Sequence, residues 1–248
     1  MNSKLSKGFL VRFLPVALLI LLATWLYERS EHQRLLDSVK NHEVLTVSQG
    51  AAGLQRHIQM IVGDLAFITE HYALQKVVND PGSPEIYRLE RNLQSLVKTR
   101  QVYGQIRWLD ATGQEKVRVD LVDGKPSLIP QEQLQNKADR YYFSEAMQKK
   151  DREVYISPLD LNVERGQIES PFKPMLRLAM PVADQQGVKQ GILIVNYRAE
   201  IMIRGLGADV SLLNSDGYWL HSPNADDAWG FMFNDASRSM PKRSPATW

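Results

Sequence analysis

An uncharged apolar run near the N-terminus constrains this chain more than any other feature. Residues 13–27 read FLPVALLILLATWLY, without a single charged side chain. A membrane-spanning helix needs about 20 apolar residues, and residues 9–11 supply the remainder if the Arg12 side chain reaches the membrane interface. Trp25 and Tyr27 lie where interfacial aromatic residues are expected. We therefore predict an uncleaved membrane anchor over residues 9–27, within a first segment 1–27.

Charge sets the expected orientation of this anchor. Lys4, Lys7 and Arg12 precede or enter the run, and positively charged flanks stay in the cytoplasm. Everything after Glu28 is then exported. The alternative is a cleaved signal peptide, but no small-x-small cleavage site follows the run.

The remaining charge and the composition exclude several classes of protein. Residues 28–248 carry 27 basic and 28 acidic side chains, so the overall charge of +2 and the pI of about 8.7 come from the N-terminus. We therefore expect no nucleic-acid partner. The chain has no cysteine, which excludes disulfides and thiolate metal sites.

A heptad rhythm follows the anchor and predicts a long stalk helix over residues 28–80. The apolar positions, spaced alternately by three and four, are Val44, Val47, Ala51, Leu54, Ile58, Ile61, Leu65, Ile68 and Tyr72. Two interpretations remain open. The stripe covers the core of its own domain, or it forms the seam of a parallel homodimer, and both can hold along one helix.

The pattern after residue 80 predicts an α+β module over residues 81–206. Residues 80–84 break the helix, and Ser83 and Pro84 suit the start of another. Helices are expected at 131–149 and 197–206. Strands are expected at 105–109, 116–121, 154–156, 175–180 and 191–197. This order predicts an antiparallel sheet with helices mostly on one face.

Residues 210–220 repeat the plan of residues 105–117: an apolar strand, an Asp or Asn turn with glycine, and a second strand. We interpret residues 207–248 as the start of a second, membrane-proximal module. Two strands cannot bury a sheet face, so we expect this module to be incomplete and the chain to be truncated.

Several local motifs resemble the double-Cache (PAS-like) extracytoplasmic sensors of bacterial signalling proteins. The motifs are LQNKADRYYF at 134–143, YISPLDLNVE at 155–164 with Gly166, Ile168, Glu169 and Pro171, PMLR at 174–177 with Gly191, Asn196 and Tyr197, and YWL at 218–220 with Ser222, Pro223 and WGFM at 229–232. The resemblance covers about residues 28–240.

The resemblance implies a periplasmic sensor in the bacterial inner membrane, which binds a small ligand and relays the signal to a histidine kinase or diguanylate cyclase. Two other interpretations compete with it: an anchored periplasmic binding or adaptor protein without an output domain, and an exported hydrolase. No catalytic motif, cofactor or metal-binding pattern is evident. The five histidines include no i,i+4 pair.

Arginines and aromatics on or beside the predicted sheet indicate a ligand site. An arginine can grip a carboxylate with two nitrogens, and aromatics wall the rest of a pocket. We predict that Arg140, Tyr142 and Arg177 face a small amino or organic acid, with Asp120 as an amine partner. The expected ligand-binding set is Arg107, Asp120, Arg140, Tyr142, Phe143, Tyr155 and Arg177.

The alternative is that these arginines pair with surface carboxylates and that the aromatics are core residues, which is the favoured interpretation for Arg118 and Tyr141. Asp160, Asn162 and Glu164 alternate in a pattern that superficially suits calcium, but a solvated loop fits better because the EF-hand glycine and glutamate are missing.

Overall fold

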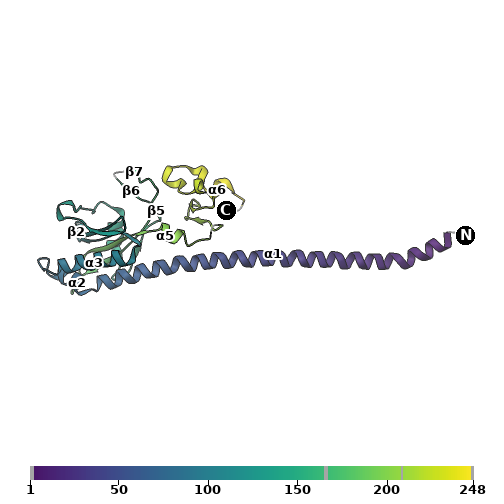
Figure 1. Cartoon of the computed structure of the whole chain (residues 1–248), viewed down its shortest axis with the longest axis horizontal. Helices are drawn as coiled ribbons and strands as arrows, with labels where there is room; N and C mark the ends of the chain where they lie inside the picture. Colours follow the sequence, from purple (N-terminus) through teal and green to yellow (C-terminus); the bar gives the residue numbers. More distant parts are fainter. Residues whose placement is uncertain (1–2, 165–166, 208, 247–248) are drawn as a thin grey trace. The chain divides into compact units, whose positions relative to one another are not determined.

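The structure, a computed structural model, describes residues 3–164, 167–207 and 209–246. Two compact units divide the chain, residues 1–49 and 50–248. The helix α1 (Ser3–Thr69) makes up the described part of the first unit and continues into the second (Figure 1). Among the described residues, one stretch of α1 near the N-terminus is long and apolar enough to cross a membrane. Its large apolar side chains, such as Leu19 and Leu21, are exposed.

An antiparallel sheet forms the centre of the second unit. Its strand order is β3-β2-β1-β9-β8-β4, with β5 also paired to β8. The bounds are β1 (Tyr103–Asp110), β2 (Glu115–Val122), β3 (Lys125–Leu128), β4 (Tyr155–Ile156), β5 (Asp160–Leu161), β8 (Pro174–Ala183) and β9 (Lys189–Arg198). A short pair, β6 (Val163–Glu164) and β7 (Gln167–Ile168), follows β5.

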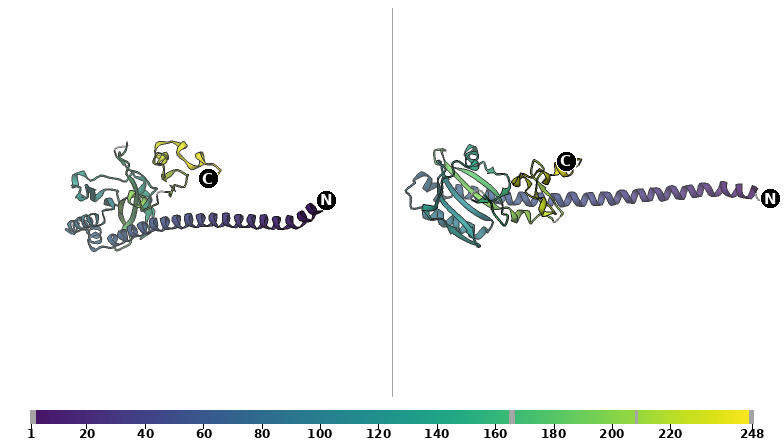
Figure 2. Two further views of the ribbon diagram at one scale, coloured as in Figure 1. Left: turned by 45° about the vertical axis from the view of Figure 1, so that its right-hand side comes forward. Right: turned by 90° about the horizontal axis from the view of Figure 1, so that it is seen from above.

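One face of this sheet is covered by helices, as the two views of Figure 2 show. α2 (Tyr72–Asn79), α3 (Ile86–Arg100) and the end of α1 pack on it. Alternate strand residues point toward them because strand side chains have a period of two. The fully buried contacts include Ile61, Leu65, Leu89 and Leu93 from the helices and Ile106, Val119, Leu178 and Val195 from the strands. The expected α+β fold is confirmed.

The heptad stripe of α1 divides along its length. Ile61, Leu65 and Ile68 are buried in the core of the second unit, so this part follows the first interpretation, in which the stripe covers its own domain. Val44 and Val47 are 58% and 57% exposed. The stalk helix also ends earlier than expected, since α1 stops at Thr69. The side chain of His71 then accepts a hydrogen bond from the Ala73 amide and caps α2.

The expected helix over 131–149 is wrong for residues 134–140. Only a 3-10 turn (Gln131–Gln133) and α4 (Tyr141–Gln148) are helical. Between them the backbone pairs with the β1–β2 hairpin: the Glu115 amide donates to the Gln135 carbonyl at 3.0 Å, and the Lys137 amide to the Gly113 carbonyl at 2.7 Å. Extended pairing therefore replaces helical hydrogen bonds. The expected helix 197–206 is reduced to α5 (Glu200–Ile203), and α3 begins at Ile86, two residues after Pro84.

The expected similarity between the two hairpins is seen in their turns, which have the same hydrogen-bond geometry. In the first turn Asp110 Oδ1 accepts from the amides of Thr112 and Gln114; in the second, Asn214 Oδ1 accepts from those of Asp216 and Tyr218. Both place a glycine at positive φ, 79° at Gly113 and 77° at Gly217. The second turn joins β10 (Leu212–Leu213) to β11 (Trp219–His221).

The C-terminal part is otherwise built of short helical elements around a small apolar cluster. They are the 3-10 turns Ala225–Asp227, Gly230–Phe233 and Ala236–Arg238 and the helix α6 (Met240–Arg243). Leu220, Ala228 and Trp229 pack there with Leu161 and Ile203 of the preceding module.

Candidate ligand-binding site

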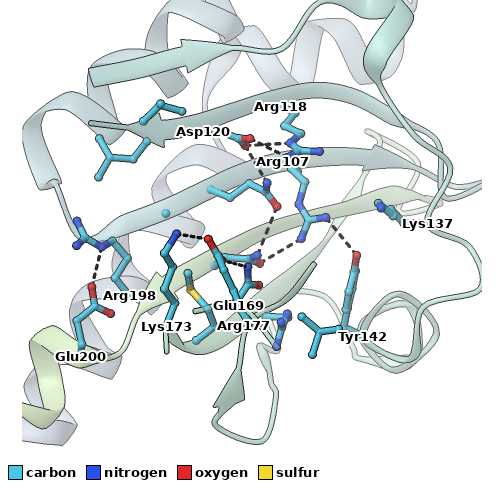
Figure 3. A pocket seen from close by; sticks show the side chains of 18 of the residues that line it. Arg107, Arg118, Asp120, Lys137, Tyr142, Glu169, Lys173, Arg177, Arg198 and Glu200 are labelled. Carbon is cyan, nitrogen blue, oxygen red and sulfur yellow. Dashed lines mark hydrogen bonds and ion pairs between the residues drawn. The ribbon is translucent and has the colours of Figure 1, made fainter. Parts of the chain in front are cut away.

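A cavity of about 950 Å³ lies on the face of the sheet opposite α1–α3 (Figure 3). Strand register explains which side chains reach it. Asp120 pairs with Gln105, Gln105 with Asn196, and Asn196 with Arg177, across β2, β1, β9 and β8. Directly opposite residues share a face of the sheet. A polar row therefore crosses four strands on the face that the helices leave uncovered.

Arg107 forms the buried floor of this cavity, with only 4% of its surface exposed. Its Nη1 donates to the Tyr142 hydroxyl at 3.1 Å and, more weakly, to Glu115 Oε1 at 3.4 Å, and its Nη2 donates to Asn196 Oδ1 at 3.1 Å. The guanidinium also lies 5.4 Å from the centre of the Tyr142 ring. A buried cation needs such partners, so Arg107 holds β1, β9 and α4 together.

A register shift brings Glu115 to Arg107. Trp108 pairs with Val117, but the next residue, Leu109, pairs with Glu115, so Lys116 is skipped. Strict alternation would place Glu115 on the same face as Val117. The irregularity moves it to the cavity face, where its Oε2 also accepts a hydrogen bond from the Gln135 amide at 3.0 Å.

The segment 134–140 is fixed against the turn of the first hairpin. Besides the two backbone bonds, Asn136 Nδ2 donates to the Thr112 carbonyl at 3.1 Å. A Cβ on Gly113 would lie 2.6 Å from the Ala138 backbone, so only glycine admits this close approach. The result is a firmly held loop that presents Lys137 and Arg140 to the cavity.

Arg177 is 7% exposed and donates through Nη1 to Asp160 Oδ1 at 2.7 Å. Burial raises the pKa of Asp160, and the charge of Arg177 opposes this rise. Burial also raises the pKa of Tyr141, whose hydroxyl lies near this pair. Arg177 therefore ends the polar row in an ion pair with Asp160.

The Asp120 carboxylate already accepts hydrogen bonds from neighbouring side chains, so it is not available as the predicted amine partner. Arg118 donates to both of its oxygens, at 2.9 and 2.7 Å, and Gln105 Nε2 donates to Oδ1 at 2.8 Å. This carboxylate is thus neutralised by a bidentate arginine. The predicted alternative for Arg118, pairing with a carboxylate, describes its position.

The structure brings five of the seven predicted ligand residues to one cavity: Arg107, Asp120, Arg140, Tyr142 and Arg177 line it. Phe143 and Tyr155 lie instead in an apolar cluster with Leu109, Ala179 and Ile194. Sequence reasoning missed Gln105, Lys137 and Asn196 as lining residues. The period of two from Arg107 and Arg177 would have indicated Gln105 and, through pairing, Asn196, but nothing marked Lys137 inside a predicted helix.

Two of the three possible calcium ligands serve other contacts. Asp160 pairs with Arg177, and Asn162 Nδ2 donates to Glu169 at 2.9 Å. The side chain of Glu164 and the residue Gly166 lie outside the described residues. The described part of the chain holds no cluster of three or more metal-binding side chains.

Comparisons with known proteins agree on the family. A family model described as the sensor domain of bacterial histidine kinases matches residues 53–248. The chain therefore belongs to the bacterial histidine kinase sensor domain family. No curated protein matches the sequence.

Solved structures show the same fold. A domain assigned to a sensory box/GGDEF family protein from Vibrio parahaemolyticus superposes with a TM-score of 0.70 at 22% identity, covering 82% of this chain and 78% of that one. The extracellular domain of vpHK1S-Z8, assigned as a histidine kinase, gives 0.69 at 22%, covering 82% and 74%. The ligand-binding domain of the Pseudomonas fluorescens chemoreceptor CtaA, in complex with L-serine, gives 0.51 at 14%, covering 79% and 74%.

These matches confirm the resemblance to Cache-type sensors. The chain carries a sensor domain of bacterial signal transduction.

Proposed function

We propose that this chain is the input region of a receptor anchored in the bacterial inner membrane, and that it binds a small carboxylic acid in the cavity on the open face of its sheet. One observation carries the proposal. Seven basic side chains line the cavity against four acidic ones, and two of the basic ones, Arg107 and Arg177, are buried. These two arginines already face carboxylates of the protein, whereas Arg140, beside the Tyr142 ring, forms no ion pair with a described residue. A guanidinium group in this position suits carboxylate recognition.

The ligand class is supported by what a relative binds, since the CtaA domain is solved with L-serine. The membrane anchor is supported by the exposed apolar side chains of residues 13–27. In this account α1 carries the ligand-induced change toward the membrane, where it governs a histidine kinase or a diguanylate cyclase. Such a relay requires that the acid binds two arrangements of the helix with different affinity.

We also propose that the receptor is a homodimer joined along α1. The apolar side chains of Leu36, Val39, Val44 and Val47 are exposed over successive turns of this helix, and a second copy would bury them. Because the chain lacks cysteine, Val47→Cys should cross-link two copies under oxidation, whereas Gln49→Cys, on the opposite side of the helix, should not. Equal cross-linking of both variants would contradict a seam at Val47.

Isothermal titration of the full chain in detergent micelles, against a panel of amino and organic acids, tests the binding function. We expect at least one acid to bind, and Arg140→Ala to weaken it about tenfold or more, which corresponds to about 1.4 kcal/mol. Arg140 is exposed, so its loss should leave the fold intact. Arg91→Ala, exposed on α3 outside the cavity, is the matched control. Unchanged affinity in Arg140→Ala would place the acid elsewhere.

A further inference from the structure

Some charged side chains of the cavity form ion pairs within the protein, and others do not. Most of its cations already hold a carboxylate: Arg118 pairs with Asp120, Lys173 with Glu169, Arg198 with Glu200, and Arg177 with Asp160. Arg107 faces Glu115 at 3.4 Å. These pairs are neutral within the protein, so they add little net charge for a ligand to balance.

Lys137 and Arg140 differ from the other cations. The Lys137 ammonium donates to the neutral Gln135 amide oxygen at 2.5 Å. Arg140 lies 5.9 Å from the centre of the Tyr142 ring, and it acts on Asp160 at longer range, although Arg177 holds that carboxylate. Among the described residues, neither Lys137 nor Arg140 forms an ion pair. Both stand on the loop fixed by Gly113 and line the cavity. Figure 3 shows Lys137 on the Tyr142 side of the cavity, and the contact of Arg140 with the Tyr142 ring places the second uncompensated cation at the same end.

The carboxylates of the cavity offer little to an ammonium group. Asp120 accepts three hydrogen bonds from Arg118 and Gln105. Lys173 and Asn162 both donate to Glu169, and the bond from Lys173 lowers the pKa of this carboxyl. Glu200 accepts from Arg198, and its second oxygen is enclosed by the protein. Of the described lining carboxylates, Asp123, in the turn between β2 and β3, is the one that forms no ion pair with a described residue.

We propose that the site selects acids with two anionic groups, of the dicarboxylate class, over monoacids and zwitterions, and that Lys137 is a specificity-determining residue. This inference rests on the proposed binding function. Two cations without carboxylate partners are best satisfied by two negative charges, because bringing a charged group out of water is costly unless an opposite charge receives it. An ammonium group would instead meet a net positive lining, and like charges repel.

Three four-carbon ligands that differ at one end test the proposal by isothermal titration of the full chain: succinate, butyrate and 4-aminobutyrate. We expect succinate to bind at least tenfold more tightly than either of the others. Lys137→Gln should remove most of this difference by weakening succinate alone, whereas Lys98→Gln, exposed on α3, should not change it. Asp123→Asn should leave succinate binding equal or stronger.

Other results would overturn the inference. If 4-aminobutyrate binds most tightly and Asp123→Asn weakens it, the site takes zwitterions. If butyrate binds as well as succinate, the second charge is irrelevant. If another amino acid binds with dependence on Arg140 while succinate does not, the proposed function stands and this inference fails. If no acid of any class binds, both fail.

Discussion

The two faces of the main sheet are made of the same strands but bury different chemistry. The face toward α1–α3 is apolar, with fully buried leucine, isoleucine and valine side chains. The opposite face carries a polar row and a cavity lined by ion pairs. One face therefore supplies apolar burial, while the other holds charged groups around a cavity. Changes on the two faces should therefore affect different measurements.

Two tyrosines of the sheet form hydrogen bonds with side chains of α1. Tyr103 and Tyr197 are register partners on β1 and β9 and point away from the cavity. The Tyr103 hydroxyl donates to Asp64 at 2.5 Å, and a hydrogen bond of 2.8 Å joins the Tyr197 hydroxyl to His57. Arg100, whose side chain is partly exposed, also donates to both Asp64 oxygens, at 2.9 and 2.6 Å. These directional contacts fix where α1 sits along the two strands whose other side carries Gln105 and Asn196.

The largest expected effect on stability is on the helix-covered face. Leu65→Ala removes a fully buried side chain and should lower the free energy of unfolding by about 2–5 kcal/mol, through lost apolar burial and a cavity. Chemical denaturation of the full chain, followed by circular dichroism, measures the change. Phe67→Ala, two residues away and 69% exposed, is the control and should cost less than about 0.5 kcal/mol. Equal losses would show that the end of α1 does not pack on the sheet as described.

A smaller effect is expected from Tyr103→Phe. The substitution removes one hydroxyl and leaves a buried Asp64 oxygen with one donor fewer, which should cost about 1–3 kcal/mol. Tyr197→Phe should cost less, because its partner His57 is only partly buried. Denaturation of the two variants under the same conditions gives the order. If Tyr103→Phe left the free energy of unfolding unchanged, the hydrogen bonds from Arg100 alone would be enough to stabilise Asp64.

The tyrosines also predict an alkaline limit to stability. Burial raises the pKa of Tyr197 and of Tyr155 to about 12, and raises that of Tyr103 further. The unfolded value is about 10, so the folded chain holds more protons above that pH. Stability should be complete below pH 10 and fall as the pH rises toward 12, by about 1.4 kcal/mol per pH unit for each such tyrosine. Denaturation between pH 9 and 12 measures this slope, and Tyr197→Phe should make it shallower. A slope unaltered by that substitution would contradict the burial of its hydroxyl.

The smallest effect on stability is expected on the cavity face. Arg140→Ala should change the unfolding free energy by less than about 0.5 kcal/mol, because the side chain is exposed and forms no ion pair with a described residue, while acid binding falls about tenfold. Thermal denaturation without added acid provides the stability measurement. A large loss of stability without loss of binding would reverse the assignment of the two faces.

The sequence predicted β1, β2, β4, β8 and β9, because their alternation and their glycine turns are local signals, but it missed the short edge strands β3 and β5. Asp110 and Gly113 correctly predicted the first turn. The conformation of the loop at 134–140 could not be predicted from the sequence. It depends on pairing with a hairpin twenty or more residues away and on the space left by Gly113. For the same reason sequence reasoning missed Lys137 in the cavity. The position of Glu115 on the cavity face could not be predicted either, because a register shift interrupts the alternation of side chains along β2.

Hydrogen–deuterium exchange of the full chain, with and without succinate, reports where on the molecule a bound acid acts. If the acid binds on the open face, amides of residues 134–142 and 174–178 should exchange more slowly when succinate is present, and Arg140→Ala should reduce this difference at the same succinate concentration. Protection confined to the C-terminal segment 212–246 upon binding, with no change at 134–142, would contradict the account.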